Sequence, residues 1–305
     1  MTDNPATRGP TIALALGAGG AKGLAHIGVI EELTARGCHV TAIAGSSMGA
    51  LIGGIHAMGK LDVYRDWVVS LAKLDVLRLV DWTLSGGLIK GDRIIDTMRE
   101  LIGDTLIEKL PIAYTAVATD IDRGREMWLT RGPLFDAIRA SIAIPTIFRP
   151  HLVDGHRCVD GALLNPVPVT PLIRERADYV IAVSLDGAAS RPPTAVAAPA
   201  TEPAVVAGYR QRIGAFVNRV LAHRDMAAAR EPGALELLAQ SIELMQANLA
   251  RLRLAAYEPD LLIQLPRNIA SAYEFYRARD LIELGRAAAH QALATWPPTA
   301  QDADA

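Results

Sequence analysis

The sequence predicts an α/β fold, a three-layer α/β/α sandwich around a mainly parallel central sheet. Two observations lead to this prediction. Through about the first 185 of the 305 residues, short apolar runs alternate with segments of helical periodicity, as in chains that build parallel sheets. The apolar runs are also hydrophobic at nearly every position, which is typical of central strands that helices cover on both faces.

Each predicted strand is an apolar run of strand length. These runs are TIALAL at 11–16, HVTAIA at 39–44, IAYTAVAT at 112–119, REMWLT at 125–130, DYVIAVSL at 178–185 and LLIQL at 261–265. Five of them lie in the first 186 residues, and the last follows far along the chain.

The predicted helices carry apolar residues at spacings of three and four. In the first of them, residues 22–36, Leu24, Ile27 and Ile30 share a face, and Gly37 is a natural stop. The others are expected at 48–59, 92–103, 133–142, 205–230, 234–256 and 271–296.

A segment rich in proline, alanine and threonine, residues 187–204, predicts a flexible connection. Because a strand follows the helical pair at 205–256, we expect this pair to be an insertion after which the sheet resumes. The expected organisation is a polar tail at 1–10, a core at 11–186, the connection at 187–204, the helical insertion at 205–256, a strand and helix completing the core at 257–296, and a tail at 297–305.

The composition excludes several classes of protein. A net charge of −2 gives no reason to expect a nucleic-acid partner. The two cysteines, Cys38 and Cys158, have no metal-ligand spacing, and such sparse usage fits a reducing compartment. No run reaches the ~18 apolar residues of a membrane span. We therefore expect a cytoplasmic protein.

The first stretch that carries chemistry is LGAGGAKGLAHIG, residues 16–28, in which a glycine loop joins a strand to a helix. Such a loop exposes backbone N–H groups that bind anions. A dinucleotide fingerprint would need glycine at position 22, which is Lys22, and a phosphate-binding P-loop would need Ser or Thr after a Gly-Lys pair. The spacing therefore fits neither nucleotide-binding motif. Two interpretations remain: a glycine-rich turn that binds no ligand, and a loop that forms an oxyanion hole.

The second stretch is AGSSMGA, in which Gly45, Ser47 and Gly49 satisfy the pattern G-x-S-x-G between a strand and a helix. The pentapeptide alone occurs by chance, but a sharp strand-to-helix turn exposes the Oγ of its central serine as a nucleophile. Ser47 is therefore the candidate nucleophile.

The third stretch, CVDGALLNPVPV at 158–169, supplies the candidate base, Asp160. Asp-Gly is an ordinary turn signal, and most such aspartates only cap the backbone. An aspartate acts as a direct base if low local dielectric raises its proton affinity. Only His223 and His290 follow the plausible acids in the chain order of a Ser–acid–His triad, and both lie in predicted helices.

Together and in this order, the three stretches resemble the patatin-like phospholipase family. The likeness covers residues 11–186 closely, including 118–155 before the aspartate, and the C-terminal part loosely. It implies a patatin-like fold, a catalytic core at 11–186 and a Ser–Asp dyad without histidine. The implied site comprises Ser47 as nucleophile and Asp160 as base, an oxyanion hole formed by Gly19, Gly20 and Lys22 within the loop Gly17 to Gly23, and the motif residues Gly45, Gly49, Gly161 and Ala162. Ala18 stands where many members have glycine, so Gly19 and Gly20 are the preferred donors.

The resemblance also implies the chemistry: a lipid acyl hydrolase of phospholipase A, lysophospholipase or carboxylesterase type that works through an acyl-enzyme without a cofactor or metal. An acyltransferase, in which an alcohol replaces water, and a regulatory protein of the same fold remain alternatives. The expected partner is a lipid or another acyl ester.

Two segments bear on lipid access. The helix at 205–230 is amphipathic and basic; it either lies in a membrane interface, as a peripheral contact with the inner face of the membrane, or packs on the domain. The apolar segment 63–91 forms part of an acyl-chain tunnel or lid, or is ordinary core. Asp120 and Asp122 lack a third ligand and are poor evidence of a metal site.

Overall fold

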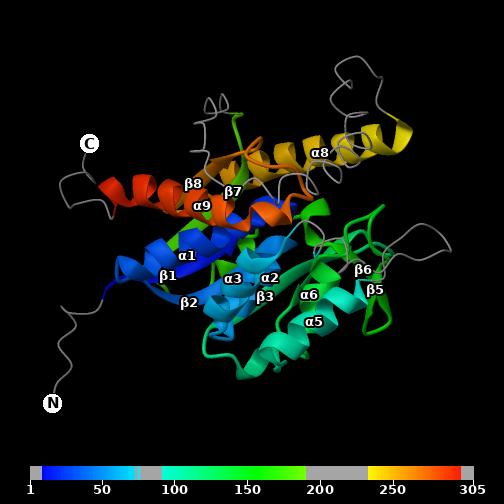
Figure 1. Ribbon diagram of the computed structural model, residues 1–305, viewed down its shortest axis with the longest axis horizontal. Helices are drawn as coiled ribbons and strands as arrows, with labels where there is room; N and C mark the ends of the chain where they lie inside the picture. Colours follow the sequence, from blue (N-terminus) through cyan, green and yellow to red (C-terminus); the bar gives the residue numbers. More distant parts are fainter. Residues whose placement is uncertain (1–8, 73–74, 76–90, 190–232, 297–305) are drawn as a thin grey trace, which may run out of the picture. The chain divides into compact units, whose positions relative to one another are not determined.

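The computed structural model describes residues 9–72, 75, 91–189 and 233–296 (Figure 1). The chain divides into two compact units, residues 1–190 with 243–305 and residues 191–242. The sheet and the candidate site lie in the first unit. The predicted helix at 205–230 and most of the segment 63–91 fall outside the described residues.

The described residues of the first unit form one eight-stranded sheet. Its strands are β1 (Thr11–Leu16), β2 (His39–Ser46), β3 (Ala113–Asp120), β4 (Arg125–Leu129), β5 (His151–Val153), β6 (His156–Asp160), β7 (Tyr179–Gly187) and β8 (Leu261–Pro266). Strands β3, β2, β1, β7 and β8 are parallel neighbours in that order, and β4, β5 and β6 add antiparallel pairs at the β3 side. The mainly parallel sheet predicted from the sequence is confirmed.

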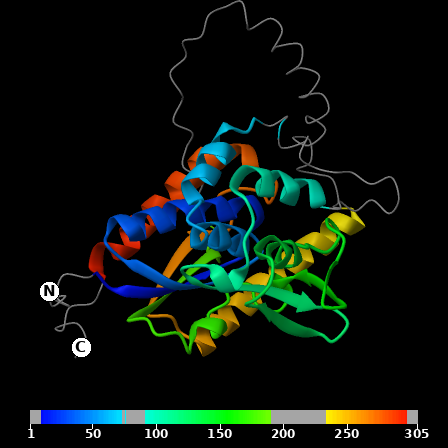
Figure 2. The ribbon, with the colours of Figure 1, turned by 90° about the horizontal axis from the view of Figure 1, so that it is seen from below.

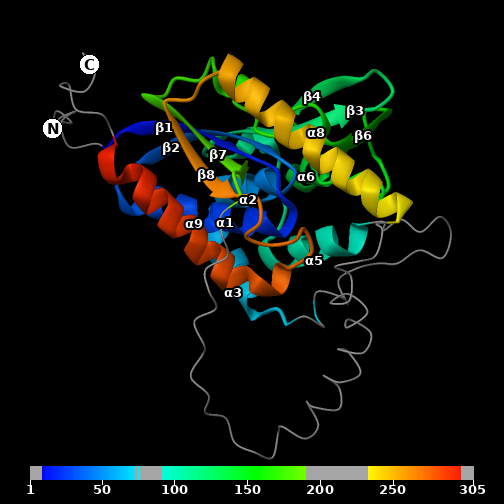
Figure 3. The same ribbon diagram turned by 90° about the horizontal axis from the view of Figure 1, so that it is seen from above.

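Helices cover both faces of this sheet. They are α1 (Ala25–Ala35), α2 (Met48–Ala57), α3 (Leu61–Ser70), α5 (Asp92–Ile102), α6 (Leu134–Ser141), α8 (Ala234–Ala256) and α9 (Ala278–Ala292). Figures 2 and 3 show α1, α2 and α9 on one side of the strands and the part of α8 that belongs to the first unit, residues 243–256, on the other. The three-layer arrangement predicted from the sequence is therefore confirmed.

Large and small side chains alternate along β1, so the hydrophobic core is larger on one face of the sheet than on the other. Ile12, Leu14 and Leu16 point into the larger core, which α1, α2 and α9 share, whereas Ala13 and Ala15 face α8. Because the strands present mainly alanine on the second face, α8 packs close to the sheet through Ala250 and Leu254. Successive strand residues point to opposite faces, so one apolar run serves both cores.

The helix bounds differ from the sequence predictions in three places. The predicted helix at 22–36 begins with a 3-10 turn, Gly20–Leu24, because the glycine loop folds tightly before α1 starts. The predicted helix at 271–296 is α-helical only over α9 and has a 3-10 turn at each end. Helix α3 was not predicted, although its buried residues, Leu61, Tyr64 and Val68, have helical spacing.

Among the described residues, no helix has the length and apolar character needed to cross a membrane.

Candidate active site

Ser47 occupies the sharp turn between β2 and α2. Its backbone has φ 55° and ψ −123°, a region that a residue with a side chain rarely adopts. Strain of this kind persists only where the surrounding structure imposes it, and it is concentrated at functional sites. The turn thus has the strained geometry of a nucleophile elbow.

The two flanking glycines are required by close backbone contacts. A Cβ added at Gly49 would lie 2.0 Å from the carbonyl oxygen of Leu16, and one added at Gly45 would lie 2.4 Å from the Ala50 nitrogen. The G-x-S-x-G pattern therefore reflects how tightly α2 meets the sheet at this point.

This contact predicts that Gly49→Ala unfolds the protein. Backbone atoms cannot yield to a contact of 2.0 Å, so we expect a loss above about 4 kcal/mol in the free energy of unfolding. Gly59→Ala is the control, because Gly59 has φ 69° and no heavy atom near its missing Cβ; its expected cost is about 1–2 kcal/mol. Urea unfolding measures both, and equal stabilities would contradict the packing described here.

Asp160 ends β6 and begins the 3-10 turn Gly161–Leu163. One carboxylate oxygen, Oδ1, accepts a hydrogen bond of 2.8 Å from the Ala162 N–H. Glycine is also required at position 161, since a Cβ there would lie 2.1 Å from the Val117 carbonyl oxygen. Asp160 is buried, with 2% of its surface exposed.

The Ser47 side chain acts directly on the Asp160 carboxylate. Burial raises the pKa of Asp160 from 3.8 to about 6, although the Ser47 side chain and the hydrogen bond from the Ala162 N–H act to lower it. A carboxylate with this pKa is ionised near neutral pH yet has a higher proton affinity than an exposed aspartate.

The register of β3 explains how residues 113 positions apart in sequence meet. Strand β2 pairs with β3 up to Ser46 opposite Val117, and β6 pairs with β3 from Asp160 opposite Ala118. Strand β4 occupies the other edge of β3 along both stretches, so β2 and β6 share one edge. The ends of β2 and β6 therefore meet at adjacent positions of β3.

The glycine loop lies across the ends of β1 and β7. Four of its backbone N–H groups are already bound: Gly17 donates to Val183 (3.0 Å), Ala18 to Pro166 (2.9 Å), Ala21 to Ala272 (3.0 Å) and Lys22 to Gly19 (3.2 Å). Within the part of the chain that the structure describes, the N–H groups of Gly19 and Gly20 have no such acceptor. These two groups are left to bind an anion.

Lys22 and His26 hold this loop in place. The Lys22 ammonium donates to the Leu185 carbonyl (3.3 Å) and lies 3.5 Å from Asp186, both on β7. His26 is fully buried, and its Nε2 donates to the Gly17 carbonyl at 2.7 Å. Burial lowers the pKa of His26 to about 4, so its ring is neutral.

No histidine of the described ranges hydrogen-bonds to Ser47. His290 lies on the surface and binds Glu32 at 2.9 Å, and His156 lies 3.5 Å from Asp120. His223 is outside the described residues. The Asp160 carboxylate is instead the group whose pKa the Ser47 side chain lowers.

Asp120 and Asp122 do not act as a pair. Asp120 caps the following turn through N–H groups of residues 122 and 123, both at 3.1 Å, whereas Asp122 pairs with Arg157. Over 9–72, 75, 91–189 and 233–296, no three His, Cys, Asp or Glu side chains are grouped so as to hold a metal ion.

Ser141 is a residue of the site that sequence reasoning missed. Its Oγ accepts a hydrogen bond of 2.9 Å from the Ser47 N–H and donates one of 2.6 Å to the Val117 carbonyl. It is fully buried at the end of α6. Ser141 thus satisfies the strained backbone of Ser47, and only long-range contacts could have identified it.

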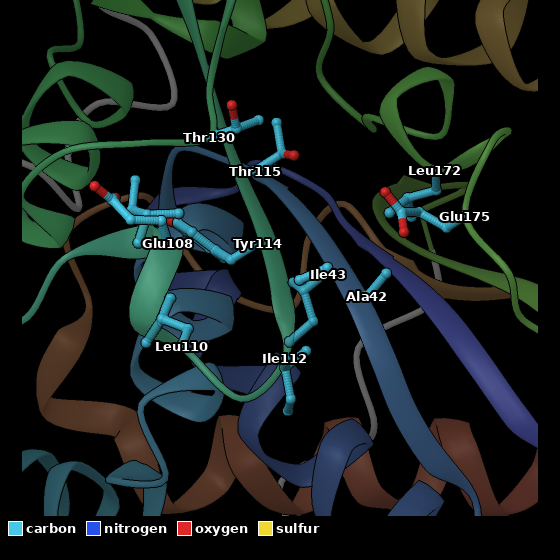
Figure 4. Close-up of a pocket in the computed structure, with 12 residues that line it drawn as sticks. Ala42, Ile43, Glu108, Leu110, Ile112, Tyr114, Thr115, Thr130, Leu172 and Glu175 are labelled. Atoms are coloured by element: carbon cyan, nitrogen blue, oxygen red, sulfur yellow. The ribbon is translucent and has the colours of Figure 1, made fainter.

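A cavity of about 230 Å³ lies elsewhere, among β2, β3 and the turn at 107–109 (Figure 4). Residues from Ala113 to Thr115 contribute to its wall, with Glu108 and Glu175 also present. Its lining includes neither Ser47 nor Asp160. This cavity is therefore not part of the candidate site.

Comparisons with known proteins show what this chain is similar to. A family model described as patatin-like phospholipase matches residues 14–173. An uncharacterized NTE family protein of Mycobacterium tuberculosis is 40% identical over 337 residues, which cover 93% of this chain and 91% of that protein. Neuropathy target esterase sws of Drosophila melanogaster is 30% identical over 187 residues, which cover 58% of this chain and 13% of that protein. All of the candidate site residues lie within the segment that the family model matches.

Proposed function

The chain belongs to the patatin-like phospholipase family, and from that premise we propose that it is a serine lipid acyl hydrolase, of phospholipase A, lysophospholipase or carboxylesterase type, with Ser47 and Asp160 as its catalytic dyad. The observation that carries the proposal is the Ser47 side chain acting on a buried carboxylate, Asp160, whose pKa burial raises to about 6. A serine hydroxyl is a weak nucleophile until an adjacent base takes its proton. Asp160 is that base.

The reaction proceeds by two acyl transfers. In the first, Asp160 takes the Ser47 proton while Oγ bonds to the ester carbonyl carbon, and the tetrahedral intermediate collapses by expelling the alcohol, which takes the proton from Asp160. In the second, Asp160 takes a proton from water, whose oxygen attacks the acyl-enzyme carbonyl. The fatty acid leaves and the proton returns to Ser47.

The oxyanion of both intermediates is stabilised by the N–H groups of Gly19 and Gly20. This proposal is supported by the backbone hydrogen bonds of the loop. Among the described residues, the N–H groups of Gly19 and Gly20 have no acceptor, whereas those of the neighbouring residues are bound. Lys22 and His26 contribute by fixing the loop to β7 and to the Gly17 carbonyl. Removal of one oxyanion donor typically lowers kcat about 10²–10³-fold.

The proposal is tested by incubating the purified protein with mixed micelles of phospholipid, lysophospholipid or neutral acylglycerol and measuring the released fatty acid. We expect free fatty acid from at least one of these lipid classes, and none from Ser47→Ala. Mass spectrometry of the products in the presence of an added alcohol separates hydrolysis from acyl transfer. A folded wild-type protein that releases fatty acid from none of them would contradict the proposal.

A further inference from the structure

A chain of polar contacts links α8 to Asn165, in the loop that follows Asp160. It begins at Arg253, whose guanidinium pairs with the Glu126 carboxylate on β4. The other oxygen of Glu126 accepts a hydrogen bond of 3.0 Å from the Asn165 side-chain amide, which also donates to Thr170 at 3.1 Å. Both N–H hydrogens of the buried amide are thereby used.

The backbone of Asn165 touches the neighbours of both dyad residues. Its carbonyl oxygen accepts a hydrogen bond of 2.6 Å from the Ser46 hydroxyl, next to Ser47. Its N–H donates to the Gly161 carbonyl at 2.8 Å, next to Asp160. A shift of Asn165 would therefore change the separation between nucleophile and base.

From these contacts we infer that Arg253 and Glu126 are positioning residues, which fix Asn165 and through it the geometry of the Ser47–Asp160 pair. The inference rests on the proposed function. It assigns a role in catalysis to α8, which lies beyond residues 14–173 matched by the family model.

The burial of the pair explains why its charges matter. The side chains of Arg253 and Glu126 are 27% and 17% exposed, so neither charge is fully solvated. Loss of Arg253 leaves the Glu126 carboxylate partly buried without its cation. Among the described residues, only the neutral N–H groups of Trp128 and Asn165, each 3.0 Å from one carboxylate oxygen, then hold it, so the carboxylate shifts toward water and its contact with Asn165 loosens. Because a small misplacement of reacting groups lowers the rate far more than it lowers binding, the effect falls on kcat.

The test compares Arg253→Met with Arg251→Met, a matched control on the same helix whose guanidinium bonds only to the Ala247 carbonyl among described residues. With a short-chain water-soluble ester, we expect Arg253→Met to lower kcat about tenfold with KM within about twofold of wild type. Arg251→Met should leave both values unchanged. Arg253→Lys, which keeps the charge, should restore kcat to within about threefold of wild type.

A double variant separates positioning from a purely structural role. In Glu126→Gln no carboxylate needs a cation, and the amide oxygen still accepts from Asn165, so adding Arg253→Met should cause little further loss of kcat. A role in holding α8 alone would lower the melting temperature of Arg253→Met without this non-additivity in kcat. If Arg253→Met does not fold, Glu126→Ala decides, since it removes the acceptor of the Asn165 amide and should lower kcat at constant KM.

Wild-type kcat in folded Arg253→Met, or equal losses in Arg253→Met and Arg251→Met, would overturn the inference and leave the proposed function standing. A wild-type protein without esterase activity would overturn the proposed function and the inference with it.

Discussion

Ser47→Ala is expected to lower ester hydrolysis by at least about 10⁴-fold while the protein stays folded. The variant removes the atom that forms the acyl-enzyme and keeps the Cβ, so the packing of the elbow is unchanged. It also removes a hydroxyl that lowers the pKa of Asp160, which should rise above its wild-type value of about 6. Steady-state kinetics measures the loss of ester hydrolysis, and circular dichroism checks that the variant stays folded.

Ser47→Gly is the matched control for strain. Glycine adopts positive φ readily, and relief of a strained backbone is worth about 1–3 kcal/mol, which exceeds the usual entropic cost of glycine. Since Ser47 has φ 55°, Ser47→Gly should be inactive yet at least as stable as Ser47→Ala. A folded Ser47→Ala protein with wild-type turnover would exclude Ser47 as the nucleophile.

Asp160→Asn is expected to abolish catalysis and to stabilise the protein at neutral pH. In the wild type, the pKa of Asp160 is raised in the folded state from 3.8 to about 6, so the folded state binds the proton more tightly than the unfolded chain does. The protonated Asp160 therefore contributes its full stabilisation of the folded state below about pH 4, and this contribution is lost as the pH rises through about 6. The shift of about two pKa units corresponds to at most about 3 kcal/mol.

The amide in Asp160→Asn does not ionise, so the variant does not lose stability as the pH rises. The variant should exceed the wild type by about 1–3 kcal/mol at pH 7–8, and the difference should disappear near pH 4. Urea unfolding across this pH range measures it. Asp96→Asn, at a side chain that is 62% exposed, is the control and should change the free energy of unfolding by less than about 0.5 kcal/mol. If Asp160→Asn were less stable than the wild type at pH 8, the claim that the ionised Asp160 carboxylate destabilises the folded protein would be wrong.

The local parts of the site could be predicted from the sequence because each is a short segment with its own geometry. A glycine loop after β1, a serine between two glycines after β2 and an aspartate before a tight turn are all visible within a few residues. Six of the eight strands and the three-layer order follow from apolar runs that alternate with helical periodicity. The short strands β5 and β6 were not among the predicted runs. Structure adds the reason for the glycines, which is the close contact of Gly49 with Leu16 and of Gly161 with Val117.

The long-range parts could not be predicted in this way. Nothing in the sequence near Asp160 indicates that β6 continues the edge of β3 where β2 ends. The contacts of Ser141 with the Ser47 N–H and of Arg253 with Glu126 join segments that are 94 and 127 residues apart. Helix α3 is a different case, since its apolar spacing was present but was interpreted as part of a longer apolar segment.

The most direct test of the account is site-mapped labelling of Ser47 by a fluorophosphonate from pH 4 to pH 9, in the wild type and in Asp160→Asn. The account predicts covalent label on Ser47 at a rate that rises through about pH 6, following ionisation of Asp160, and almost no label in Asp160→Asn. Labelling of Asp160→Asn at the wild-type rate, or label on another serine, would contradict the dyad.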